Sequence, residues 1–206
     1  MTAVPRIATG PIPLPAGLAG IAPLTDTEPW LPVRDTPHPD GASSMVWLVG
    51  AHGGAGVSTL AQMWQHAGDG GARWPGLSTE SPYTVLVARD TAAGLDAAHL
   101  ALRQYHTEHD IPARLLGLIL VAGGPGNRTS EVRRLRQTVT SLAGMSWSIP
   151  WLDQLLELPI KALATADPNT LPQKRVKDLT HAVHQDIARL GTELRDLVHA
   201  DASANN

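Results

Sequence analysis

The sequence predicts an α/β domain whose parallel sheet has about four or more strands flanked by helices. Three observations predict this fold class: short continuous apolar runs, helical apolar spacing between those runs, and a Gly-rich stretch directly after the first run. A continuous apolar run is typical of a strand that is buried on both faces of a parallel sheet. Strands that alternate with helices indicate βαβ units.

The expected elements follow one another along the chain from residue 45. The expected strands span residues 45–49, 83–88, 115–122 and 145–149, and the expected helices span 57–67, 95–109, 129–142 and 176–199. Thr129 or Ser130 suits the N-cap of the third helix. A loop and a short helix are expected over 151–165. The apolar stripe of the last helix predicts packing on the sheet, with a second subunit as the alternative.

The composition of the 206-residue chain excludes several classes of protein. Because there is no cysteine, disulfides, thiolate catalysis and cysteine zinc sites are excluded. The net charge of -3 makes DNA an unexpected partner. No apolar run is long enough for a membrane span, and the N-terminus lacks a signal-peptide pattern. We therefore expect a cytoplasmic protein with no membrane span.

We expect the chain to have three parts. Residues 1–44 hold nine of the 17 prolines and are expected to form a disordered Pro-rich tail. The folded domain is expected over 45–200, and a disordered C-terminus over 201–206. Within the tail, residues 28–33 form an apolar island. This island is expected to be either a linker or a segment that docks on the domain or on a partner.

The Gly-rich stretch lies where a phosphate-binding loop belongs, between the first strand and the first helix. It reads Gly50-Ala51-His52-Gly53-Gly54-Ala55-Gly56-Val57-Ser58-Thr59-Leu60. Glycines let successive main-chain amides point inward, and the helix N-terminus favours an anion. In the standard pattern Gly-x-x-x-x-Gly-Lys-Ser/Thr, Ala51 takes the first glycine position, Val57 the lysine position and Ser58 the magnesium-ligand position.

This stretch resembles the deviant P-loop of the ParA/MinD family, which reads Lys-Gly-Gly-x-Gly-Lys-Thr/Ser-Thr. The residues that match are Gly53, Gly54, Gly56, Ser58 and Thr59. His52 replaces the signature lysine that reaches a dimer partner's nucleotide, and Val57 replaces the lysine that touches the β- and γ-phosphates. The resemblance covers about residues 45–165 and implies a trimmed P-loop NTPase-like domain. The whole string is also similar to small ParA/MinD-like proteins of actinobacterial conjugative elements.

The resemblance implies ATP or ADP with magnesium as a weakly held cofactor. The residues that it places around the nucleotide are His52, Gly53, Gly54, Ala55, Gly56, Val57, Ser58 and Thr59, with Ser58 and Asp90 toward the metal. Asp90 is followed four residues later by Gly94, which resembles the family's switch II pattern. The alternative is that Asp90 and Thr91 cap the next helix. Val121 stands where the family often has a base-recognising Asn.

Loss of both lysines removes the nearest fixed cations from a phosphoryl-transfer site. We therefore expect a degenerate ParA/MinD-like protein that acts as a positioning or assembly factor in a bacterial partition or conjugation machine, with weak or absent turnover. Protein partners and a homodimer are the expected contacts.

Two alternatives stay open. An active ATPase that dimerises over nucleotide needs Lys161, Arg128 or a partner residue near Ser58. A scaffold with a structural Gly-rich loop predicts instead that Val57 packs down and closes the loop.

Overall fold

Five parallel strands form the central sheet, in the spatial order β3-β2-β5-β6-β7. They are β2 (Val46–Gly50), β3 (Ala67–Asp69), β5 (Tyr83–Asp90), β6 (Arg114–Ala122) and β7 (Ser146–Ile149). The structure is a computed structural model that describes residues 20–38, 44–126, 128–172 and 176–204. The predicted α/β class, with a parallel sheet flanked by helices, is confirmed.

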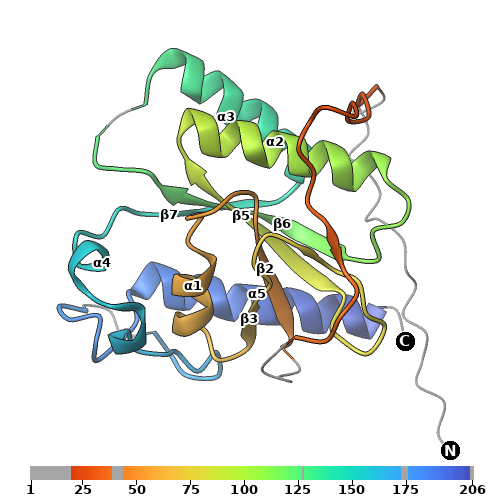
Figure 1. The fold of residues 1–206 in the computed structure, drawn as a ribbon. Helices are drawn as coiled ribbons and strands as arrows, with labels where there is room; N and C mark the ends of the chain where they lie inside the picture. The colour runs from red at the N-terminus through yellow and green to blue at the C-terminus, as the bar shows by residue number, and fades with distance from the viewer. Residues whose placement is uncertain (1–19, 39–43, 127, 173–175, 205–206) are drawn as a thin grey trace, which may run out of the picture.

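Helices cover both faces of this sheet, as Figure 1 shows. One layer contains α1 (Val57–Met63) and α5 (Gln185–Ala204), and the other contains α2 (Ala92–Thr107) and α3 (Ser130–Ala143). The strand residues alternate between the two layers: Val85 and Val87 of β5 pack with the α1/α5 layer, whereas Leu86 packs with the α2/α3 layer. Burial on both faces is why these strands read as continuous apolar runs.

The strand order sets the place where a ligand is expected. Counted along the chain, the five strands lie in the order 2-1-3-4-5. In such a doubly wound sheet the connections leave β2 and β5 toward opposite faces, which opens a crevice at their carboxyl ends. The Gly-rich loop follows β2, and Asp90 ends β5. The predicted site residues therefore converge on the switch point of the sheet.

The first helix is shorter than predicted, and a strand follows it. Helix α1 ends at Met63 instead of residue 67, and the chain turns at Trp64 into β3, which pairs with β2 from Val46↔Ala67 to Leu48↔Asp69. Trp64 anchors this turn, because its indole nitrogen donates to the Ile187 carbonyl oxygen at 2.9 Å. The Gly68-Asp69-Gly70 stretch has no apolar pattern that would predict a strand.

The last helix begins nine residues later than predicted. The structure places it at Gln185–Ala204 rather than 176–199. The apolar residues Leu179 and Val183 are buried as their spacing suggests, but the backbone there is not helical. Asp178 accepts hydrogen bonds from both the main-chain N–H and the hydroxyl of Thr180. Such local side-chain bonds offer the backbone an alternative to helix. A short helix α4 (Gln154–Glu157) and a 3-10 turn η1 (Ile160–Ala162) precede this region, as predicted for residues 151–165.

The prediction of a disordered tail over 1–44 is wrong for residues 20–38, which pack against the α2 side of the domain (Figure 1). The buried Gln104 side chain of α2 accepts from the Leu31 N–H and donates to the Leu31 carbonyl oxygen, each at 2.8 Å. Strand β1 (Val33–Arg34) pairs with β4 (Trp74–Pro75). The island at 28–33 thus docks on the domain. The predictions for 1–19 and 39–43 lie outside the described residues.

Residues 201–204 also correct the predicted disordered C-terminus, because they complete α5. Asp201 accepts a hydrogen bond from the Tyr83 hydroxyl at 2.9 Å and forms an ion pair with Arg114. Burial, together with the hydrogen bond to Asp201, raises the pKa of Tyr83 to about 12. The end of α5 is thereby fixed to the amino ends of β5 and β6. Residues 205–206 lie outside the described residues.

Candidate functional site: the Gly-rich loop and the carboxyl edge of the sheet

The Gly-rich loop joins β2 to α1 in the predicted position. Gly54 and Gly56 have φ angles of 75° and 107°, a left-handed conformation that favours glycine. Gly56 is the N-cap of α1 and has no side chain to cap it. Gly53 and Gly54 are exposed, and a Cβ built on either would meet no atom within 4 Å. The outer surface of the loop is therefore open.

The His52 ring braces this loop against β5. A main-chain N–H can only donate, so His52 Nε2, which lies 3.1 Å from the Arg89 nitrogen, is the acceptor. The proton of the neutral ring is then on Nδ1, which donates to the Gly53 carbonyl oxygen at 2.8 Å. Gly94 lies against the same ring: a Cβ there would stand 3.0 Å from Nε2. In this arrangement His52 is a neutral internal brace rather than a cation beside the loop.

The Arg89 side chain lies across the same crevice. Its Nε donates to the Gly54 carbonyl oxygen at 3.0 Å, and its Nη1 donates to the Ala122 carbonyl oxygen at 3.1 Å. The guanidinium thus joins the Gly-rich loop to the end of β6. His52 and Arg89 thus both bond to the protein's own main chain at the switch point of the sheet.

Val57 lies at the position of the missing lysine and is buried. It packs in the cluster between the sheet and the α1/α5 layer, with 7% of its surface exposed. A Cβ built on Gly50 would stand 3.2 Å from its Cγ2. The Val57 side chain therefore packs down beneath the loop, as the scaffold alternative requires.

The two predicted metal ligands are engaged on opposite sides of β2. The Ser58 hydroxyl donates to Asp69 Oδ2 at 2.5 Å, at the end of β3. Asp90 ends β5, on the other side of β2. Its side chain is only 1% exposed and pairs with Arg128 and with Arg136, whose Nε lies 3.0 Å from Oδ2.

The partners of Ser58 and Asp90 show whether the loop could hold a nucleotide with magnesium. No contact brings Ser58 and Asp90 together, and within the described ranges no group of three His, Cys, Asp or Glu residues is arranged to hold a metal ion. The N-cap of α2 is Thr91, whose side chain accepts from Gly94. The capping alternative therefore holds for Thr91, and Asp90 is an ion-pair partner. With Val57 at the lysine position, the residues present do not fit Mg-ATP.

A cavity of about 270 Å³ opens beside the loop. Gly56, Thr59 and Arg89 line one side of it, and apolar side chains of the segment after β7, including Trp151 and Leu155, line the other. Lys161, in η1, is exposed, and Arg128 is held at Asp90. Of these three cations, Arg89 is the one that hydrogen-bonds to the loop within the described residues, at the Gly54 carbonyl oxygen.

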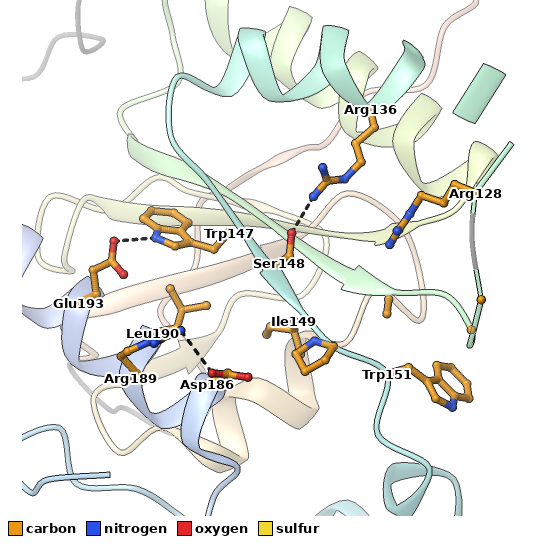
Figure 2. A pocket seen from close by; sticks show the side chains of 14 residues that line it. Arg128, Arg136, Trp147, Ser148, Ile149, Trp151, Asp186, Arg189, Leu190 and Glu193 are labelled. Carbon is orange, nitrogen blue, oxygen red and sulfur yellow. Dashed lines mark hydrogen bonds and ion pairs between the residues drawn. The ribbon is translucent and has the colours of Figure 1, made fainter. Parts of the chain in front are cut away.

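A groove of about 620 Å³ runs along β7, farther from the Gly-rich loop. Figure 2 shows Trp147, Ser148 and Ile149 in the middle of this groove. Arg128 and Arg136 lie on the α3 side, and α5 contributes the acidic and basic side chains on the other side (Figure 2). Arg136 Nη2 donates to Ser148 Oγ at 2.6 Å, and Trp147 Nε1 donates to Glu193 Oε1 at 2.8 Å.

The family model described as "Family of unknown function (DUF6668)" matches residues 44–168. The chain belongs to the DUF6668 family. The DUF6668 region runs from β2 to beyond η1, so it includes the Gly-rich loop, Asp90 and β7. The docked segment 20–38 and helix α5 lie outside it. No match to a curated protein and none to a solved structure was found.

Sequence reasoning missed three functional partners in the DUF6668 region. Arg89, Asp69 and Arg136 belong to none of the motifs that the sequence analysis singles out. Their contacts arise from strand order, which places the ends of β3, β5 and β6 around the loop. Within the described parts of the chain, no helix has the length and apolar character needed to cross a membrane.

Proposed function

We propose that this chain is a catalytically inactive, P-loop-like protein that acts as a positioning or assembly factor. The observation that carries the proposal is the burial of Val57 at the lysine position, which leaves an apolar group where a triphosphate needs a cation. The engagement of Ser58 by Asp69 and of Asp90 by two arginines supports it. A protein of this kind works through its contacts with other macromolecules.

The resemblance of residues 50–60 to the deviant P-loop of the ParA/MinD family supports the cellular setting of this proposal. We infer that the larger assembly is a bacterial partition or conjugation machine and that the protein works in the cytoplasm. The glycines keep the loop shape, while the neutral His52 brace and the Arg89 guanidinium hold the loop without a phosphate.

A second candidate is weak nucleotide binding without turnover. The observation that favours it is the cavity beside the loop, where an apolar wall stands opposite Arg89 and Thr59. Such a cavity suits a flat, partly apolar group held near a single cation. In this case the assembly factor binds the nucleotide as a ligand and does not hydrolyse it.

Calorimetric titration of ATP and ADP into the full chain, with and without magnesium, tests the proposal. We expect no magnesium-dependent binding in the micromolar range and no phosphate release. Binding that is weak and independent of magnesium supports the second candidate. Micromolar binding that requires magnesium, together with steady phosphate release, would overturn the proposed function and favour an ATPase.

A further inference from the structure

The open edge of β7 is the feature that the proposed function leaves unused. Strand β7 is the last strand of the sheet, and within the described residues it pairs only with β6. The Leu118 N–H donates to the Met145 carbonyl oxygen at 3.0 Å, and Ser146 is the partner of Leu118 in the ladder. In a parallel ladder with this register, the main-chain groups of Ser146 and Ser148 face away from β6. Among the residues that the structure describes, these donors and acceptors of the edge have no partner strand.

This edge has one of the devices that usually protect an edge strand, a length of only four residues, and lacks others. Natural edge strands are very short, carry charged side chains, prolines or bulges, or are covered by another segment. The sequence of β7 is Ser-Trp-Ser-Ile, both serines are exposed, and no register irregularity interrupts its pairing with β6. The first proline, Pro150, comes after the strand has ended. The groove of about 620 Å³ lies along this edge.

The two sides of the groove differ in chemistry. On the α3 side, Arg128 and Arg136 share the single carboxylate of Asp90, so this side carries an excess of positive charge. About a third of each arginine side chain is exposed. On the α5 side, Trp147, Ile149 and Leu190 pack in the apolar cluster. Asp186, Arg189 and Glu193 of α5 also line this side, and Glu193 accepts a hydrogen bond from the Trp147 indole. The side chains of an added strand would alternate between these two sides.

We propose that the β7 edge binds an extended segment of a partner protein as a sixth strand of the sheet. The segment recognised in this way alternates acidic side chains, which face Arg128 and Arg136, with apolar side chains, which face Trp147. Main-chain hydrogen bonds to Ser146 and Ser148 supply affinity, and the alternation supplies specificity. The inference rests on the proposed assembly role and names the kind of partner.

A second copy of this chain is a poorer occupant of the edge. Two β7 strands related by a two-fold axis pair antiparallel, with the α3 layers on the same face of the joined sheet. The Arg128 and Arg136 pairs of the two copies would then lie beside each other and repel. Charge complementarity instead favours an acidic segment.

Hydrogen exchange of the full chain tests the inference. The probe is an end-capped peptide of alternating Glu and Val, about eight residues long. We expect the Ser146 and Ser148 amides to exchange about tenfold more slowly, or slower still, when the peptide is bound. A peptide with Lys in place of Glu should bind about tenfold more weakly or worse. A peptide N-methylated at every residue, which cannot pair through either of its edges, should not protect the two amides.

Substitutions at Ser148 supply a matched pair of variants. In S148P the outward N–H is lost while the bonds to β6 remain, because proline is tolerated where the N–H faces away from the sheet. We expect S148P to bind the Glu/Val peptide about tenfold more weakly than S148A, because both variants lack the hydroxyl and only S148A keeps the N–H. The N-methylated peptide makes the same test on the unaltered chain if S148P does not fold.

Three results would overturn the inference: no protection of the two amides by the Glu/Val peptide, binding that tolerates N-methylation and S148P, or protection that grows with protein concentration without peptide. The last result would assign the edge to a second copy. Tight magnesium-dependent nucleotide binding would overturn the proposed function and leave the exchange result standing. The failure of one proposal is therefore distinguishable from the failure of the other.

Discussion

The main-chain N–H of Arg89 donates a hydrogen bond to Nε2 of His52, and this bond fixes the proton of the neutral ring on Nδ1. The residue at the signature-lysine position therefore connects two elements of its own domain. A lysine has only donors, so it would leave the Arg89 N–H without this partner.

Replacement of His52 measures how much the two hydrogen bonds of its ring contribute to the free energy of unfolding. We expect H52A to lower the free energy of unfolding by about 1–2 kcal/mol, because the part-buried Arg89 N–H loses its acceptor and the exposed Gly53 carbonyl loses its donor. H52Q keeps an acceptor and should restore part of the loss. Urea denaturation provides the measurement. Equal stability of H52A and the unaltered chain would show that the His52 ring does not stabilise the loop.

A lysine at residue 57 should not restore an ATPase. The Val57 side chain is buried, so V57K places a charge where the core is apolar. We expect V57K to cost about 2–3 kcal/mol of stability, and V57A, which only removes methyl groups, about 1–2 kcal/mol. Denaturation and a phosphate-release assay make the comparison. A V57K chain that is as stable as the original and hydrolyses ATP would refute this expectation.

Asp90 should behave as an ion-pair centre and not as a metal ligand. In D90N, Arg128 and Arg136 lose their shared carboxylate, and we expect a loss of about 2–3 kcal/mol because the two arginines are partly solvated. Magnesium should leave the Tm of the unaltered chain unchanged. A magnesium-dependent rise in Tm that D90N abolishes would instead identify Asp90 as a ligand.

The docking of residues 20–38 should depend on Gln104. Its amide accepts from the Leu31 N–H and donates to the Leu31 carbonyl oxygen. In Q104E the side chain keeps the acceptor but points a carboxylate oxygen at that carbonyl. We expect Q104E to expose this segment to limited proteolysis. E28Q, which removes one end of the ion pair to Arg103, is the milder control. Identical cleavage of Q104E and the unaltered chain would contradict the docking.

Acid should destabilise the fold through His66. Burial, as the largest cause, holds the pKa of His66 below its ordinary value of 6.5. The unfolded chain then binds more protons than the folded chain just below pH 6.5, so stability falls as the pH drops through this value. H66N should reduce the slope without abolishing it, because burial also lowers the pKa of His99. Denaturation curves between about pH 7 and pH 5 give the slopes. An unchanged slope in H66N would contradict this assignment.

The sequence predicted the strands that are buried on both faces, because burial leaves a continuous apolar run. The expected strand at 83–88 and the observed β5 (Tyr83–Asp90) share their first residue. Strands β1 and β3 could not be predicted in this way. Their pairing depends on segments that become neighbours only in the fold: Val33 pairs with Trp74, and Gly68 pairs with Trp47.

The candidate site could be located from the sequence but not described. A Gly-rich turn between an apolar run and a helix fixes the position of the loop, and the lysine losses are visible directly. The partners of the loop residues come from other strands. Asp69 reaches Ser58 because β3 lies beside β2, and Arg89 reaches Gly54 because β5 lies on the other side. Strand order is a property of the whole chain.

Helix α5 runs the length of the sheet, from Asp186 at the groove to Asp201 at the first residues of β5 and β6 (Figure 1). Its 20 residues span about 30 Å at 1.5 Å per residue. A fluorophore or surface tether attached at Ala204, the last residue of α5, therefore starts at the opposite end of the molecule from Pro150, which follows β7. Immobilised in this way, the protein presents its groove to the solution, which suits sensor measurements of peptide capture.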